Sequence, residues 1–219
     1  MNTPTHILVA VSLLARPRSP RRNLLVIAGA LVPDLSIFVF FACMQLFTSL
    51  SMEQIWREAY WTEPWQTLGA ISNSVPIAIG LLALGTWRKV PLVTVFALAL
   101  LTHALLDFPL HADDAHKHFW PLSDWRFHSP VSYWDPSHHG AIGNLIDLTV
   151  FVAACVVIWH RFRARWVRAS IVVTAVLYVA VAAYFFISFS EGPTKQSGGA
   201  ASIVLSENTH LELFGWRKF

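Results

Sequence analysis

The chain has 219 residues, of which 55% are hydrophobic and 13% are charged, and its formal net charge is +3. A soluble domain carries about 25% charged residues, so this composition excludes an ordinary soluble domain and predicts a protein that faces lipid. The basic residues stand in short clusters beside apolar runs, which is the pattern of membrane topology, and we therefore expect no nucleic-acid partner.

Five apolar runs are long enough to cross a bilayer, which takes roughly 20 residues. A sixth run, 6–15, precedes them and is too short for an ordinary span. We predict an all-α, multi-pass transmembrane helix bundle over residues 1–189 and interpret residues 190–219 as a tail that forms a small cap. In chain order, the predicted spans are 24–50, with a kink at Pro33, then 69–87, 91–110, 143–159 and 169–189.

Three clusters of basic residues indicate the orientation of these spans. They lie at 16–22, 88–89 and 161–168, in loops that alternation places on one side of the membrane. Because short loops rich in Lys and Arg remain in the cytoplasm, we expect the histidine-rich loop 111–142 on the outer side.

The region from His103 to His139 holds seven of the ten histidines in the chain. His103, Asp107 and His111 recur every fourth residue and share one helix face, although Pro109 ends or bends the helix before His111. Ionisable residues inside a span are costly and usually functional, and imidazole and carboxylate groups are ligands of zinc and similar ions. We therefore predict His103, Asp107 and His111 as metal ligands.

Three further ionisable residues lie in apolar runs at a similar depth. A helix rises 1.5 Å per residue, which puts His6, Asp34 and Asp147 about 15 to 18 Å from the cytoplasmic boundary. We predict that they converge with His103 and Asp107 on one polar pocket, with His6 and Asp34 as further metal ligands and Asp147 as a secondary residue. A structural alternative stays open for each alone, since Asp34 can cap a helix that begins after Pro33 and Asp147 can cap the fourth span.

The loop supplies the remaining candidates. Asp113 or Asp114 is predicted to act as a general base or to orient a ligating histidine, with simple solvent exposure as the alternative. The stretch 119–136 is rich in aromatic residues and proline, so we expect it to lie rigidly at the membrane interface, over the metal or against the bundle. The loop residues assigned to substrate binding or a secondary role are His116, His118, His128 and His139.

The chain carries four short motifs in a fixed order: Thr5-His6, Gly29-Ala-Leu-Val-Pro33-Asp34, His103-Ala-Leu-Leu-Asp107 and Trp120-Pro-Leu-Ser. Together they resemble the YdjM-like family of inner-membrane, metal-dependent hydrolases, over most of the chain up to the fourth span. The resemblance implies a bacterial multi-pass protein with metal ligands at His6, Asp34, His103 and Asp107. Many relatives carry Thr-His-Ser before the second span, and here Asn73 stands in place of that histidine, so we assign Asn73 to substrate or water binding.

A second resemblance is local. The eleven residues His103-Ala-Leu-Leu-Asp107-Phe-Pro-Leu-His111-Ala-Asp113 are similar to a motif of zinc-dependent phospholipase C and P1-type nucleases. Those enzymes are soluble helical proteins that cleave phosphoesters with clustered zinc ions, so the likeness implies a ligand set and a reaction class.

The sequence therefore predicts a membrane-bound, metal-dependent hydrolase at the outer face of the bacterial cytoplasmic membrane. Its expected substrate is a phosphoester or another amphiphilic molecule, small or drawn from membrane lipid, and its expected cofactor is a divalent metal, zinc or else manganese. Two alternatives remain: a protein that binds or transports a divalent metal without hydrolysis, and a structural membrane protein whose polar pocket ties the helices together. A transport path needs polar residues in the inner halves of the spans, and these are few.

Overall fold

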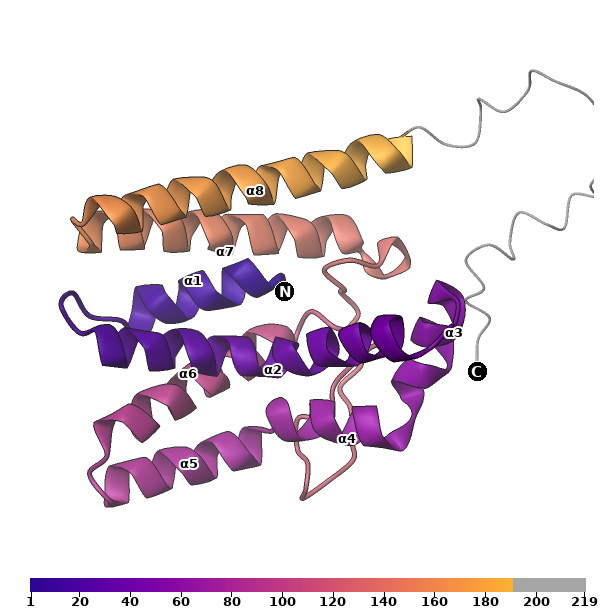
Figure 1. Cartoon of the computed structure of the whole chain (residues 1–219), viewed down its shortest axis with the longest axis horizontal. Coiled ribbons are helices and arrows are strands. Elements are labelled where there is room, and N and C mark those ends of the chain that lie inside the picture. The colour runs from indigo at the N-terminus through magenta and orange to yellow at the C-terminus, as the bar shows by residue number, and fades with distance from the viewer. Residues whose placement is uncertain (191–219) are drawn as a thin grey trace, which may run out of the picture. The chain divides into compact units, whose positions relative to one another are not determined.

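The computed structural model describes residues 1–190, and every regular element in this range is a helix, which confirms the predicted all-α class (Figure 1). The longer helices are α1 (Thr3–Leu14), α2 (Pro20–Phe47), α4 (Glu63–Ser72), α5 (Val75–Trp87), α6 (Pro91–Asp107), α7 (Gly140–Arg161) and α8 (Arg165–Ser190). Three short helices lie in the connections: α3 (Met52–Arg57), η1 (Ala59–Trp61) and η2 (Pro136–His138). The predicted cap lies outside the described residues, apart from Ser190 at the end of α8.

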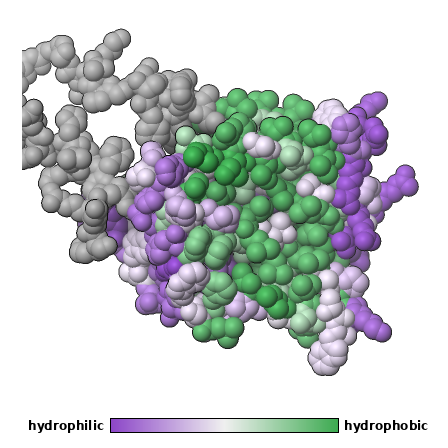
Figure 2. Space-filling model, turned by 180° about the vertical axis from the view of Figure 1, so that it is seen from behind, coloured by the Kyte–Doolittle hydropathy of each residue, from purple (hydrophilic) through white to green (hydrophobic). Residues whose placement is uncertain are grey.

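Three helical stretches of the described chain are long and apolar enough to cross a membrane: Pro20–Phe47, Glu63–Trp87 and Gly140–Arg161. Helices α1 and α6 are apolar but shorter, so the count of about five spans stays a prediction. Figure 2 shows one face of the molecule, where hydrophobic side chains form a broad band bounded by polar side chains. A soluble monomer rarely exposes so large an apolar surface, and the band is consistent with a membrane protein.

Two helix boundaries differ from the predicted ones. Helix α2 runs on through Pro33, so Asp34 lies inside a helix and does not cap a new one. The predicted second span is divided, because α4 ends at Ser72 and α5 begins at Val75. Ser74 caps α5 by accepting a hydrogen bond from the Ile77 N–H at 3.1 Å, and a proline in the first turn suits a helix start.

Small residues let the helices around α1 approach closely. Helix α1 packs against α2, α6 and α7, and a cluster of buried side chains fills the space between α1, α2 and α6. Its buried members are Ala10, Val26, Ala30, Val95 and Ala99. A Cβ atom built on Gly29 of α2 would lie only 2.5 Å from the carbonyl oxygen of Phe96 on α6, so only glycine permits this spacing. The contact brings the first half of α2 against the first half of α6.

The two ends of the bundle differ in their connections. The turns between α1 and α2, α5 and α6, and α7 and α8 lie together at one end, on the left of Figure 1, and carry the three basic clusters. The segment 108–139 lies at the other end, beside α4. Arg126 donates to Gln66 Oε1 at 2.7 Å and Val75 donates to the His118 carbonyl at 2.9 Å, and these bonds tie the segment to α4 and α5. The basic clusters thus share one end, as predicted, while the side of the membrane stays a prediction.

Candidate metal centre

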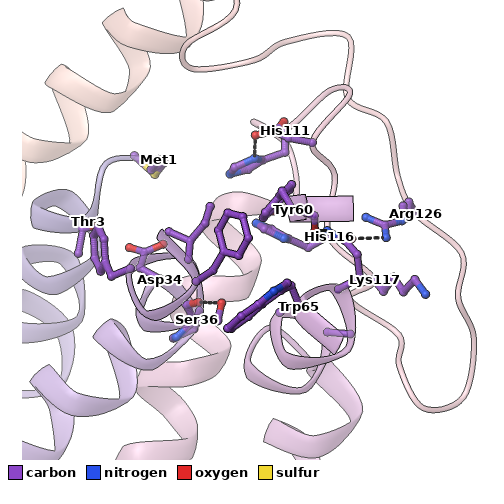
Figure 3. Close-up of a pocket in the computed structure, with 18 of the residues that line it drawn as sticks. Met1, Thr3, Asp34, Ser36, Tyr60, Trp65, His111, His116, Lys117 and Arg126 are labelled. Atoms are coloured by element: carbon purple, nitrogen blue, oxygen red, sulfur yellow. Dashed lines mark hydrogen bonds and ion pairs between the residues drawn. The ribbon is translucent and has the colours of Figure 1, made fainter. Parts of the chain in front are cut away.

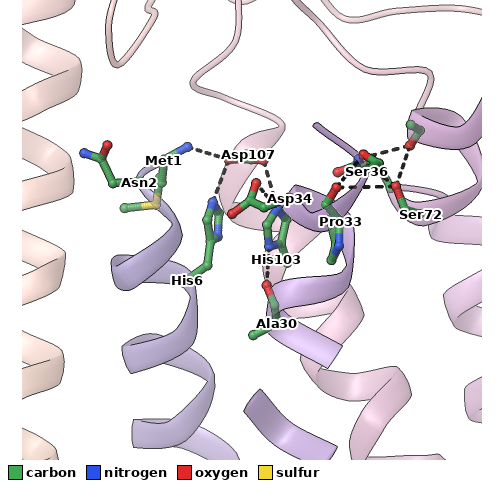
Figure 4. A network of polar contacts seen from close by, with 12 residues as sticks. Met1, Asn2, His6, Ala30, Pro33, Asp34, Ser36, Ser72, His103 and Asp107 are labelled. Carbon is green, nitrogen blue, oxygen red and sulfur yellow. Dashed lines mark hydrogen bonds and ion pairs between the residues drawn. The ribbon is translucent and has the colours of Figure 1, made fainter. Parts of the chain in front are cut away.

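Four of the predicted ligands meet where α1, α2 and α6 come together (Figure 4). His6 Nε2 lies 2.8 Å from Asp107 Oδ1, and His103 Nε2 lies 3.1 Å from Asp107 Oδ2. Asp34 Oδ1 is 3.6 Å from His103 Nε2, and the amino group of Met1 also contacts Asp107. The two imidazole rings stack with their centroids 3.7 Å apart. His6, His103 and Asp107 are buried, so this cluster of ionisable groups is largely shielded from solvent.

The hydrogen bond on the far side of His103 fixes its tautomer. His103 Nδ1 donates to the carbonyl oxygen of Ala30 at 2.7 Å, and a carbonyl can only accept, so the neutral ring presents a lone pair on Nε2. That lone pair faces the carboxylates of Asp107 and Asp34, which also present lone pairs. Lone pairs that face one another are stable only when a proton or a metal cation lies between them. A histidine that binds a metal commonly donates its other ring N–H to a backbone carbonyl, as His103 does here. The donor set therefore fits a divalent cation.

Asp147 meets the chain just before α1, and its predicted secondary role in the pocket stays a prediction. Its carboxylate accepts from the backbone N–H of Asn2 at 3.1 Å and from Asn2 Nδ2 at 2.8 Å. Asn2 immediately precedes α1. The fully buried carboxylate of Asp147, on α7, therefore accepts hydrogen bonds from the N-terminal end of α1. Asp147 thus fastens α1 to α7 and sets the depth at which α1 presents His6.

A second group of candidate ligands follows α6 directly. His111 Nε2 lies 3.3 Å from Asp107 Oδ1, and its Nδ1 lies 2.8 Å from Asp114 Oδ2. One ligand atom from each of Asp107, His111 and His116 lies within 4.8 Å of the others, and the same holds for His6, Asp34 and His103. Asp107 is in contact with both groups and therefore stands between them as a shared carboxylate.

The charges of the second group follow from its surroundings. Burial disfavours a charge on His111, but the carboxylates of Asp107 and Asp114 outweigh it and raise the pKa of His111 to about 9. Burial, aided by the neighbouring His111, lowers the pKa of His116 to about 3, so His116 is neutral and offers a lone pair. Burial opposes the ionisation of Asp114, yet the hydrogen bond from His111 prevails and lowers its pKa to about 2. Asp114 is thus an anion that holds the Nδ1 of His111.

A cavity of about 280 Å³ lies beside both groups (Figure 3). Asp34, His111, Asp114 and His116 line one part of its wall. Residues that the sequence analysis did not single out line the rest, among them Phe38, Tyr60, Trp65, Lys117 and Arg126. No local motif marks these residues, because they come together only when segment 108–139 folds against α4.

Asp113 and Asn73 do not line this cavity. Asp113 is exposed and lies near Asp135 and His138, which form an ion pair of 2.7 Å in the turn before α7. Asn73 is the C-cap residue of α4, and its Nδ2 donates to the Gly69 carbonyl at 3.0 Å. Its predicted contact with substrate or water stays a prediction.

Three loop histidines also lie outside the cavity wall. Two of them form hydrogen bonds with backbone carbonyls, and the third is the N-cap residue of α7. His118 Nδ1 donates to the Asn73 carbonyl at 3.2 Å, and His128 Nδ1 donates to the Ala112 carbonyl at 2.8 Å. His139 precedes α7 with a left-handed backbone, φ 55°. Among the loop histidines of the sequence analysis, His111 and His116 are those that join the ionisable cluster.

The geometry of this cluster is the main guide to function. No protein-family model, curated protein or solved structure matches the chain. The functional assignment accordingly depends on the side chains that the fold brings together.

Proposed function

We propose that this chain is a membrane-embedded, metal-dependent hydrolase of the YdjM-like kind, with a divalent metal held by His6, Asp34, His103 and Asp107. The observation that carries the proposal is the contact between His103 Nε2 and two carboxylates, with the Nδ1–H of the ring donated to the Ala30 carbonyl. In a cluster that merely ties helices together, donors lie opposite acceptors, whereas a neutral His103 ring here sets its Nε2 lone pair against the carboxylates of Asp34 and Asp107.

The second group extends the proposed site toward the cavity. His111 and His116 would complete it, with Asp107 shared between the two groups. A divalent metal bound in such a site polarises the scissile group and lowers the pKa of a bound water to near 7. Asp114 Oδ2 lies 2.8 Å from His111 Nδ1, so its proposed role is to orient that ring. Asp113 is exposed and outside the cavity, so of the two predicted acidic residues we retain Asp114.

A hydrolase fits the surroundings of the site better than a transporter does. The buried cluster next to the site on the side of the basic turns consists of Ala10, Val26, Ala30, Val95 and Ala99. A metal ion crossing this layer would lose its ligands, and moving a bare charge into such an apolar layer costs several kcal/mol or more. The site instead opens on the cavity lined by residues of segment 108–139.

The location proposed for the chain is the bacterial cytoplasmic membrane, with segment 108–139 on the outer side. Three helices of spanning length and the grouping of the basic turns at one end support this orientation. The substrate would then be an amphiphile in the outer leaflet.

Metal analysis tests the proposal directly. We expect detergent-purified wild-type protein to carry near-stoichiometric zinc or manganese by mass spectrometry, and His103→Ala and Asp107→Ala to lose it while their circular dichroism spectra stay helical. His128→Ala is the matched control, because the only partner of the His128 ring among residues 1–190 is the Ala112 carbonyl, and this variant should leave the metal content unchanged. A wild-type protein that binds no metal after reconstitution with zinc and manganese would contradict the proposal. Bound metal without hydrolysis of any phosphoester or ester amphiphile would leave a binding function.

A further inference from the structure

One cationic side chain of the cavity wall, Arg126, has neutral hydrogen-bond and ring partners. Arg126 donates from Nη1 to the Ala115 carbonyl and from Nη2 to Gln66 Oε1 at 2.7 Å, and its guanidinium lies 5.8 Å from the centroid of the Trp61 ring. No carboxylate of the described chain lies within ion-pair distance of it. A guanidinium has five N–H donors, so three remain for a ligand. Arg126 therefore presents at the cavity wall a positive charge without a direct ion pair in the described chain, while the carboxylates of Asp124 and Glu63 act on it from a greater distance.

Lys117 adds a second cation to the same wall. Its Nζ pairs at 3.0 Å with Asp124, whose side chain is 74% exposed and does not line the cavity. An exposed carboxylate is screened by water and binds weakly, so Lys117 can exchange this partner for an anion in the cavity. Figure 3 shows Lys117 and Arg126 on one flank of the cavity and Asp34 on the other.

The cavity wall is apolar where it meets α2. Ile37, Phe38 and Phe40 line it there, together with Trp65 of α4. Phe38 is 49% exposed on a helix of spanning length, so this edge of the cavity is continuous with the outer apolar surface. The cavity thus joins a polar interior, with Lys117 and Arg126 on one flank, to a surface suited to hydrocarbon.

We propose that the cavity binds an amphiphile with an anionic oxygen headgroup, which Arg126 and Lys117 hold while its hydrocarbon chain leaves past Phe38. The planar fork of arginine matches the oxygens of a phosphate or carboxylate. The inference rests on the proposed function, because Asp34 and Asp114 also line the cavity and a bound cation offsets their charge. A neutral amphiphile would leave Arg126 without a charged partner, and a small free anion would make no use of the apolar edge.

Calorimetric titration of the metal-reconstituted full chain in a maltoside detergent tests this inference. The probes are decyl phosphate, inorganic phosphate and decanol, and metal content is measured on each sample. We expect decyl phosphate to bind at least tenfold more tightly than either other probe. Arg126→Gln should weaken that binding about tenfold or more with unchanged metal content, and Arg126→Lys should restore part of it, since the charge returns without the fork. Lys117→Gln should give a smaller loss in the same direction. Arg57→Gln is the control, because Arg57 pairs with Glu53 outside the cavity.

Each outcome separates this inference from the proposed function. Equal binding of decyl phosphate by wild type and Arg126→Gln, with a thermal midpoint that shows the variant folded, would overturn the inference while leaving a metal site intact. Inorganic phosphate binding as tightly as decyl phosphate would also overturn it, in favour of a site for a soluble anion. Wild-type protein that holds no metal but still binds decyl phosphate through Arg126 would uphold the anion site and remove the hydrolase.

Discussion

The contact between α2 and α6 at Gly29 offers a sensitive test of the site, because it lies next to Ala30, whose carbonyl holds His103. In Gly29→Ala, the new Cβ would lie 2.5 Å from the Phe96 carbonyl oxygen, about 1 Å short of the ordinary contact distance of 3.4 Å. Overpacking of this kind costs about 1–3 kcal/mol. A shift of similar size would stretch the 2.7 Å bond from His103 to Ala30 beyond the roughly 3.2 Å limit of a hydrogen bond. His103 would lose its orientation, and we expect metal affinity to fall about 10- to 100-fold.

Competition with a chromophoric chelator measures the metal affinity, and reversible unfolding in mixed micelles measures the free energy of unfolding. Gly80→Ala is the matched control, since nothing lies within 4 Å of a Cβ at Gly80 in α5. A Gly29→Ala protein that equals Gly80→Ala in both measurements would refute the reasoning that helix spacing positions the ligands.

Three further predictions concern the loop and its supports. Asp114→Ala should weaken metal binding about 10- to 100-fold, whereas Asp113→Ala, which changes an exposed residue outside the cavity, should not; equal effects in the chelator assay would count against the role of Asp114. Asn73→Ala should lower the free energy of unfolding by about 1 kcal/mol and leave metal affinity within twofold, and loss of the metal would contradict its structural placement. The hydrogen bond to Asp135 raises the pKa of His138; burial opposes ionisation of Asp135, but the His138 contact lowers its pKa. The stabilisation that this pair gives to η2 is therefore lost as pH rises through the raised pKa of His138, and also as pH falls through the lowered pKa of Asp135. Hydrogen-exchange protection of η2 should follow this window. His138→Ala should remove the alkaline limb and keep the acid limb, because Ser137 still donates to Asp135 in that variant; an unchanged alkaline limb would oppose the assignment.

The sequence predicts some of these features well because depth along a helix follows from counting residues. His6, Asp34, His103 and Asp107 lie at similar depths in separate apolar runs, and the fold brings them into contact. The contact between Asp147 and Asn2 could not be predicted in this way, because counting residues gives depth and does not tell which neighbour a side chain faces around its helix.

The cavity wall is harder to predict for a related reason. Arg126 reaches Gln66 across 60 residues of chain, through a segment without regular periodicity. Neither residue belongs to a motif, and the apolar pattern that locates spans gives no information on how an irregular loop folds back. The division of the second predicted span at Ser74 was in principle readable, since a serine followed two residues later by Pro76 is a common helix start.

The contact between His6 and Asp107 has a consequence for the order in which the protein matures. These residues are 101 positions apart, so at a synthesis rate of about 5–20 residues per second the ribosome makes Asp107 about 5–20 s after His6. Asp147, which fastens α1, is made later still. A nascent chain that holds only its first two helices has no complete set of these ligands. Under the proposed function, metal would therefore bind only at the end of biogenesis, after the bundle has closed.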